Sequence, residues 1–365
     1  MRPRAPDPGP IAPLALAAWF GLVTGLLELG LLLVQNRLYG TATLGVLQLN
    51  RHFTWMVPVT HLTIFGACGL VLTFVNRLRP GGTPRLAAFL PCALGFFSLF
   101  LTIPGLYAAA WALLACGLAA HVVPRIEARG RAFRRLVRLS LPALLVVVAA
   151  LVGVRFGRMV LAERWARAGL PAARPGAPNV LLIVMDTVRA DRLSLHGYGR
   201  ATSPNLEGLG RRGVRFEQAR ATAPWTLPSH ASLFTGRWQH ELKVFVNRPL
   251  DATYPTVAEF LRDRGYATAG FVANTRFCNS WYGLSRGFAH YEDYYEANLV
   301  VSPTETLRSA ELGRRILQVA CAARNVRPGE TNRRKDAAKI NQDFLGWLSG
   351  QGNRPFFAFL NYYDA

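Results

Sequence analysis

The stretch "NVLLIVMD", Asn179–Asp186, decides the fold class of the second half of the chain. Its unbroken apolar run has the length of a strand, and the absence of alternation is typical of a strand buried on both faces of a parallel sheet. Ligands of open α/β sheets bind beyond the carboxyl ends of the strands, where Asp186 stands. A buried carboxylate there needs a partner or a metal ion, and the alternative is an acid that caps a helix or lies in a loop.

Strand and helix patterns alternate after this run. We expect helices where a capping residue, proline or glycine bounds an apolar pattern, and strands in short apolar or alternating runs. The alternation predicts an α/β domain with a mainly parallel sheet. The expected helices are 203–213, 228–236, 256–266 and a polar, arginine-rich helical region at 304–348, and the expected strands are 214–219, 267–273 and 355–363.

The first half of the chain has a different composition. It offers five apolar runs, whereas a helix that crosses a bilayer needs roughly 20 mostly apolar residues. So many runs in so short a segment would leave too little polar surface for a soluble core, which favours a multi-span α-helical membrane domain with the lipid bilayer as its partner. The runs are Ile11–Gln35, Phe53–Val75, Leu86–Ile103, Leu106–Val123 and Leu139–Val154.

Arginines account for most of the net charge of +21, and they cluster in alternate loops between these runs. Because positive charge marks the cytoplasmic side, the pattern places the N-terminus in the cytoplasm and everything after Val154 outside it. We therefore expect a multi-pass protein of an inner or plasma membrane with an extracytoplasmic outer domain. Without a binding motif, the charge does not predict a nucleic-acid partner. The clusters are Arg2 and Arg4, Arg77, Arg79 and Arg85, and Arg125, Arg129, Arg131, Arg134, Arg135 and Arg138.

Composition also divides the chain. Residues 1–156 form the expected membrane domain, the segment 157–177 is rich in Arg, Ala, Gly and Pro and indicates a linker, and 178–365 form the α/β domain. The last expected strand is followed at once by the end of the sequence, so the outer domain is expected to be truncated. Cys278 and Cys321 could pair only in an oxidising compartment.

The stretch "APWTLPSHASLFTG", Ala223–Gly236, holds the second candidate site residue. Thr226 stands before Pro228 at the start of an expected helix, where unpaired N–H groups and the helix dipole favour an anion. Its hydroxyl is either a helix cap or a nucleophile for an anionic centre. Ser229 and His230 lie in the first turn, facing either the anion or solvent.

Together these motifs resemble the N-terminal half of the sulfatase branch of the alkaline phosphatase superfamily. The resemblance rests on "PNVLLIVMDTVRADRLSLHGY", on "TSPNLEGLGRRGVRFEQARATAPWTLPSHASLFTG", and on "RDRGYATAGFVAN", "LSRGFAHYED" and "RPFFAFLNYYD" in the same order. It implies a site for a divalent metal ion (Ca, Mg, Mn or Zn), with Asp186 as a ligand. It also implies that Thr226 is both nucleophile and metal ligand, with Ser229 and His230 against the anion. The implied substrate is an anionic ester such as a glycan, a lipid or a small molecule.

Four departures from the sulfatase pattern bear on the chemistry. Thr226 stands where sulfatases have a Cys or Ser that becomes formylglycine, and threonine cannot give that aldehyde. His230 replaces the motif's Arg, and Thr187 replaces the second Asp of an Asp-Asp pair. The usual Gly-Lys-Trp-His stretch has no match near "FVANTRF", and the family's late metal ligands would lie downstream, so the chain alone is expected to be nearly inactive.

Three hypotheses remain from the sequence. The first is a membrane-anchored sulfatase-family enzyme that hydrolyses a sulfate or phosphate ester outside the cytoplasm with a metal ion. The second is a phosphoethanolamine- or phosphoglycerol-type headgroup transferase, because membrane-bound members of the superfamily use a Thr nucleophile. The third is a non-catalytic, truncated relative that binds an anionic polymer.

Overall fold

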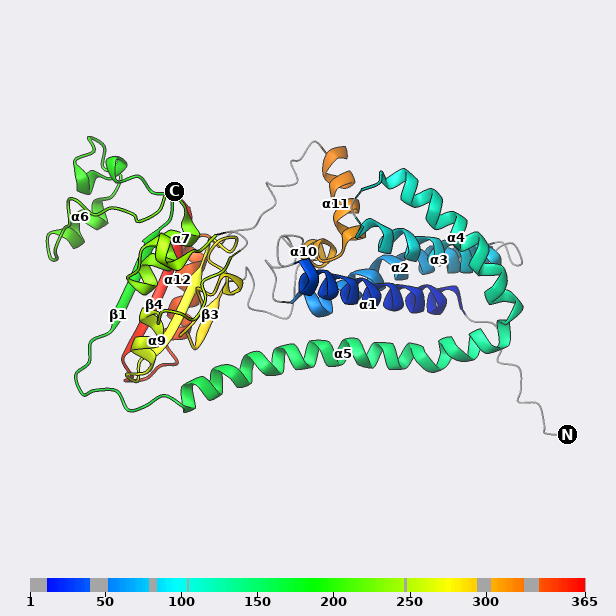
Figure 1. Ribbon diagram of the computed structural model, residues 1–365, viewed down its shortest axis with the longest axis horizontal. Helices are drawn as coiled ribbons and strands as arrows, with labels where there is room; N and C mark the ends of the chain where they lie inside the picture. The colour runs from blue at the N-terminus through cyan, green and yellow to red at the C-terminus, as the bar shows by residue number, and fades with distance from the viewer. Residues whose placement is uncertain are drawn as a thin grey trace. The chain divides into compact units, whose positions relative to one another are not determined.

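A computed structural model describes residues 12–39, 52–78, 84–103, 105–245, 248–293, 303–324 and 335–364. The chain divides into two compact units. A helical unit comprises residues 1–159 and 298–331, and an α/β unit comprises residues 160–297 and 332–365. Figure 1 shows the helices and strands of both units.

The helical unit contains the predicted spans. Four helices in the described residues are long and apolar enough to cross a membrane, and the third of the five predicted runs forms a shorter apolar helix, Arg85–Leu101. Gly25 lies against the Cα of Pro58, so that a side chain there would prevent the close contact of the first two helices. The helices are α1 (Pro13–Tyr39), α2 (Phe53–Leu78), α3 (Pro84–Leu101), α4 (Ala108–Ala128), α5 (Gly130–Ala168), α10 (Pro303–Arg308) and α11 (Glu311–Ala323).

The α/β unit is built on a four-stranded sheet. Its order is β1-β4-β2-β3, and every neighbouring pair is parallel, as predicted. The sheet confirms the α/β class and brings the carboxyl ends of all strands to one edge. The strands are β1 (Val180–Met185), β2 (Ala267–Val272), β3 (His290–Glu292) and β4 (Phe356–Tyr362).

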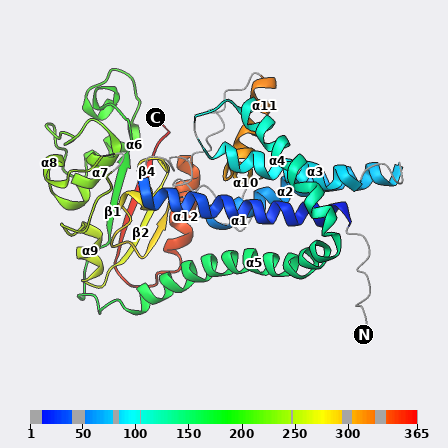
Figure 2. The same cartoon turned by 45° about the vertical axis from the view of Figure 1, so that its right-hand side comes forward.

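Helices cover both faces of this sheet (Figures 1 and 2). On one face α7 (Thr226–Thr235) and α9 (Val257–Arg262) pack on Phe357 and Phe359 of β4. On the other face α12 (Ala337–Leu348) packs on Ala358 and Leu360. Alternate residues of β4 thus enter two cores, which explains why the strand has no polar face. The short helices α6 (Pro204–Gly210) and α8 (Gln239–Leu242) complete the unit.

Two details differ from the sequence prediction. The expected strand at 214–219 is wrong, because these residues form no strand and Val214 and Phe216 are 82% and 74% exposed. In the described structure, this alternating segment has no neighbouring strand with which it could pair. The short strand β3 was not expected.

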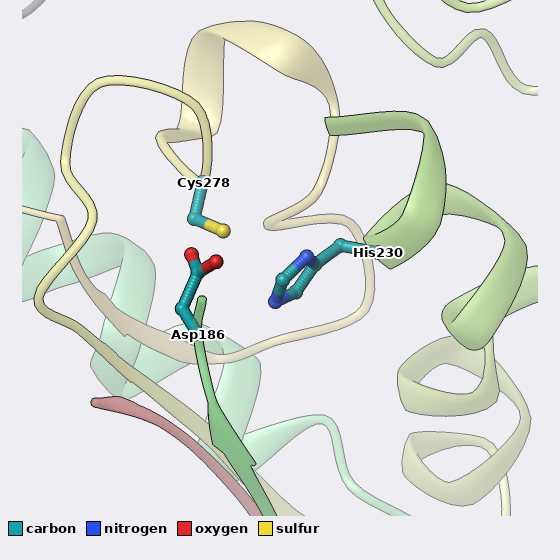
Figure 3. A group of neighbouring side chains, drawn as sticks. All are labelled: Asp186, His230 and Cys278. Carbon is teal, nitrogen blue, oxygen red and sulfur yellow. The ribbon is translucent and has the colours of Figure 1, made fainter. Parts of the chain in front are cut away.

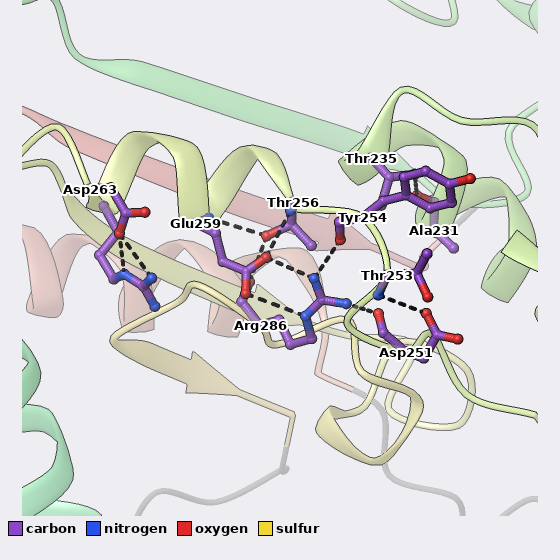
Figure 4. A network of polar contacts seen from close by, with 10 residues as sticks. Ala231, Thr235, Asp251, Thr253, Tyr254, Thr256, Glu259, Asp263 and Arg286 are labelled. Carbon is purple, nitrogen blue, oxygen red and sulfur yellow. Dashed lines mark hydrogen bonds and ion pairs between the residues drawn. The ribbon is translucent and has the colours of Figure 1, made fainter.

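A polar network fixes the loops beneath α7 and α9 (Figure 4). Thr256 and Glu259 form a capping box at the start of α9, and the guanidinium of Arg286 donates to Glu259 at 2.8 Å. Arg286 also donates to the carbonyl oxygens of Asp251 and Tyr254. One guanidinium therefore joins the helix start to the loop that precedes it.

A second, more buried network lies at β3. His290 contacts the carboxylates of Glu163 at 3.3 Å and Glu292 at 2.9 Å, and Lys335 joins Glu292 to Asp343 at 2.7 and 2.8 Å. Burial alone would lower the pKa of His290, but the hydrogen bonds to Glu163 and Glu292 raise it to about 9. Burial opposes ionisation of Glu292, yet His290 and Lys335 lower its pKa to about 2.

These shifts predict a pH dependence of stability. Because the folded pKa of His290 is raised, its contribution is complete below the unfolded value of about 6.5 and is lost as the pH rises through about 9. We expect His290→Gln to lower the free energy of unfolding by roughly 2–3 kcal/mol at mildly acid pH and by far less above the folded pKa. Thermal unfolding of the full chain in detergent across this pH range measures the difference. The exposed His240 gives the control His240→Gln, and equal effects of both variants at every pH would contradict the assignment.

Candidate active site at the strand ends

Three polar side chains meet at the carboxyl edge of the sheet. Asp186 directly follows β1, and its backbone N–H donates to the carbonyl of Tyr362 in β4 at 2.8 Å. Asn361 lies near the end of β4, and Asn274 lies just beyond β2. The backbone N–H of Asn274 donates to Oδ1 of Asn361 at 2.9 Å, so the ends of three neighbouring strands are tied together.

Thr226 joins this group from α7. It is the first residue of the helix, and the N-cap is Trp225, so the alternative that Thr226 caps the helix is wrong. Its Oγ1 lies 3.4 Å from both carboxylate oxygens of Asp186 and accepts from Nδ2 of Asn274 at 3.2 Å. The hydroxyl is therefore directed to the acid at the strand end.

In the described structure, the carboxylate of Asp186 is buried without an arginine or lysine partner. It is 8% exposed, and its Oδ2 accepts from the amides of Asn274 at 2.8 Å and Asn361 at 3.4 Å. Within the described part of the chain, Asp186 makes no ion pair with arginine or lysine. Burial of an uncompensated ion costs several kcal/mol, so this arrangement suits a carboxylate that holds a cation.

His230 presents one ring nitrogen to the same place. Its Nδ1 lies 2.8 Å from the carbonyl oxygen of Thr226, one helical turn earlier, and must carry a proton to donate to it. Burial lowers the pKa of His230, although the Thr226 carbonyl and the charge of Asp186 oppose the shift. In the neutral ring Nε2 carries a lone pair, which lies 3.5 Å from Nδ2 of Asn361 and can accept a hydrogen bond or bind a metal ion.

Cys278 completes the cluster. Ligand atoms of Asp186, His230 and Cys278 lie within 4.8 Å of one another, and Figure 3 shows the three side chains converging. Burial, followed by the charge of Asp186, raises the pKa of the Cys278 thiol well above its usual range. The sulfur therefore stays protonated unless a metal ion displaces the proton.

The donor set fits a divalent cation. A carboxylate, an imidazole nitrogen and a hydroxyl are ordinary ligands of such ions, and among the described residues Oδ1 of Asp186 has a hydrogen-bond contact with Thr226 alone. The two amides instead direct N–H groups at Asp186, so they orient the acid rather than add ligand atoms. Asp186, His230 and Cys278 have ligand atoms close enough to hold one ion, and the Thr226 hydroxyl lies beside the same carboxylate.

The turn after β1 is strained. Thr187 has φ of 66°, in the left-handed region that a β-branched residue rarely adopts. Such strain costs roughly 1–3 kcal/mol and persists where the surrounding structure imposes it. Here the hydrogen bond of Asp186 to β4 fixes the residue before the turn.

Other polar and cysteine residues of the chain lie in different surroundings. Ser229 is half-buried in the first turn of α7, and in the described structure its hydroxyl makes no hydrogen bond to Asp186 or Thr226. Asp191 pairs with Arg189 at the surface, at 2.6 Å. Cys278 and Cys321 are both free thiols.

Sequence reasoning missed Asn274, Asn361 and Cys278. The two asparagines carry the signal that identified Asp186, namely a polar residue where a buried strand ends. Cys278 lies six residues beyond β2, and its sequence neighbourhood gave no sign of the approach to Asp186.

Comparison with known proteins agrees with this geometry. A family model described as Sulfatase matches residues 178–364, which include the whole sheet. The α/β unit is therefore a domain of the alkaline phosphatase superfamily. Because the match covers about half of its length, the chain belongs to the sulfatase family.

Individual relatives match shorter stretches. The chain is 36% identical to a mouse (Mus musculus) steryl-sulfatase over 140 residues, and 36% identical to human (Homo sapiens) arylsulfatase A over 110 residues. These stretches are 35% and 28% of this chain and 21% of each relative, so the match spans about a fifth of their length. A lipooligosaccharide phosphoethanolamine transferase A from Neisseria meningitidis aligns over 98% of this chain and 69% of its own, at 16% identity and a TM-score of 0.32. That likeness is too weak to carry a conclusion.

The cluster predicts selective stabilisation by a divalent cation. We expect Ca²⁺, Mg²⁺, Mn²⁺ or Zn²⁺ to stabilise the metal-free chain by about 2.7 kcal/mol when present at a hundredfold excess over its Kd. Asp186→Asn should abolish the stabilisation, whereas Asp191→Asn should keep it because that acid is exposed and already paired. Thermal unfolding with each ion in turn measures the effect. Equal stabilisation of both variants, or none by any of the four ions, would contradict the assignment.

Proposed function

We propose that the chain carries the nucleophile and the first metal ligands of an active site that cleaves or transfers an anionic sulfate or phosphate ester. The observation that carries the proposal is the contact of the Thr226 hydroxyl with the buried Asp186 at the start of α7. Membership of the sulfatase family supports the class of chemistry.

The start of α7 suits an anionic centre. The first N–H groups of a helix have no intrahelical partners, and the helix dipole adds positive potential there. Pro228 at the third position has no N–H, which leaves the amides of Thr226 and Leu227 to face an anion. An ester bound there lies beside the Thr226 hydroxyl.

The proposed step is a displacement at phosphorus or sulfur. Oγ1 of Thr226 forms the new bond, the ester oxygen leaves with the electron pair of the broken bond, and the proton lost by Thr226 passes through Asp186 to the leaving alcohol. Water or an acceptor alcohol then attacks the same phosphorus or sulfur, Oγ1 of Thr226 leaves with the electron pair of its bond, and the proton lost by the attacking group returns to Oγ1. A divalent cation held by Asp186, Thr226 and His230 would lower the pKa of the hydroxyl and stabilise the developing negative charge.

Two outcomes of this step correspond to two candidate functions. Attack by water makes the protein an ester hydrolase, and attack by an acceptor alcohol makes it a headgroup transferase. The residue itself favours the second candidate, because threonine cannot become the formylglycine on which sulfatases rely. The arginine pattern supports an active site outside the cytoplasm, with the bilayer as partner.

Substitution of Thr226 tests the nucleophile. We expect Thr226→Ala to lower turnover by on the order of 10³-fold or more, because a nucleophile cannot be replaced by positioning alone. Thr226→Ser should keep measurable activity and a covalent adduct. Thr235→Ala is the matched control, since Thr235 lies at the other end of α7, where its hydroxyl donates to the Ala231 carbonyl and accepts from the N–H of Arg237. The assay is release from chromogenic sulfate and phosphate esters, measured with a form of the protein that carries the family's late metal ligands.

The fate of the transferred group separates the candidates. With a radiolabelled phospholipid donor, label retained on Thr226 and passed to an alcohol indicates a transferase, and free phosphate or sulfate indicates a hydrolase. Turnover that does not depend on Thr226 would contradict the proposed nucleophile, and the absence of both label and turnover would leave the non-catalytic alternative.

A further inference from the structure

The segment that contains α10 and α11 packs in the helical unit, although it follows β3 in the sequence. Thr60 of α2 donates to the carbonyl of Thr306, and its hydroxyl lies 3.0 Å from Oγ of Ser309. Figures 1 and 2 both show α10 and α11 beside α2 and α3. The segment is thus a part of the helical unit that the span pattern did not include.

The N-terminus of α11 is held by a buried acid. The backbone N–H of Glu311 donates to Oε1 of Glu28 at 2.9 Å, and Glu28, in α1, is 1% exposed. The other carboxylate oxygen lies 3.0 Å from Nε2 of His61 and accepts from Ser98 at 3.2 Å. Because buried carboxylates need such partners, this contact fixes where α11 begins.

The apolar face of α11 is only partly covered. Its first turn places Leu312 in a cluster with Phe65 and Leu101, where it is 4% exposed. The same face continues for two more turns with Ile316 at 42% and Val319 at 72% exposure, and with the exposed alanines Ala320 and Ala323. The positions follow the i, i+3, i+4, i+7 spacing of one helix face.

The opposite face of α11 is polar and basic. Arg314, Arg315 and Gln318 project there, and Glu311 pairs with both arginines. A helix with an apolar stripe and an arginine-bearing polar face has the composition of one that lies at a membrane surface. The arginines complement the headgroups of anionic lipids.

We propose that α11 lies in the boundary between headgroups and acyl chains of an anionic bilayer, beside α2 and α3. The occupant of its exposed apolar stripe is lipid, because the covered first turn of that stripe packs on α2, which is long and apolar enough to span a membrane, and on the shorter apolar helix α3. A protein partner would instead have to cover one continuous apolar surface that extends from those helices along α11.

Site-directed spin labelling tests the proposal on the full chain in vesicles of phosphatidylethanolamine and phosphatidylglycerol. Cys68, Cys116 and Cys321 are first replaced by Ser, while the buried Cys92 and Cys278 stay. A label is then attached in the Val319→Cys variant, and in the matched variant Gln318→Cys, which lies on the polar face one residue away. We expect collision with oxygen, relative to a water-soluble nickel chelate, to be several-fold higher at 319 than at 318.

Three results would overturn the proposal. Equal access of the nickel chelate to both labels would place the stripe in water. Poor access of both reagents at 319 would indicate a protein partner. Spin–spin broadening that disappears on dilution with unlabelled chain would indicate a second copy. A label in Ile316→Cys repeats the measurement if the first label disturbs the helix, and a reduced difference in purely zwitterionic vesicles would support the role of the arginines.

Discussion

The buried carboxylate of Asp186, which has no arginine or lysine beside it in the described structure, sets the arrangement of the α/β unit's functional edge. Two amides, from the ends of β2 and β4, donate to one of its oxygens and leave the other facing Thr226. The parallel sheet is what makes this possible, since only strands that run the same way bring their carboxyl ends to one edge. The parallel topology of the sheet thus brings the residues of the site together.

Helix α7 contributes two side chains to the surroundings of Asp186. Its first residue, Thr226, directs a hydroxyl at the acid, and the carbonyl of the same residue fixes the ring of His230 through Nδ1. Buried contacts of Leu227 and Phe234 with β4 hold the helix axis, so that the hydroxyl and the imidazole are placed by packing. The strained backbone at Thr187 fits the same picture, because relaxing that turn would move Asp186 out of its bond to β4.

How much of this could be predicted depends on the range of the interactions. The runs that became β1, β2 and β4 are recognisable because burial on both faces leaves them apolar, and Asp186, Thr226 and His230 follow from local context. The approach of Cys278 to Asp186 is set by a loop whose path no local pattern encodes. For the segment 214–219, in contrast, the local pattern predicted a strand that the structure does not contain. Alternation produces a strand only where a partner strand is available.

The helical unit contains a long-range contact that the sequence did not predict. Glu28 lies within an apolar run, and nothing nearby in the sequence indicates that its partner is a backbone N–H some 283 residues away. Read linearly, the sequence predicts one passage from membrane domain to outer domain, whereas the chain passes between the two units after residues 159, 297 and 331. The sulfatase match, 178–364, therefore includes a segment that packs with the helices. A domain connected in this way is attached to its helical unit by an internal segment as well as by α5, so a cut in the linker alone would not separate them.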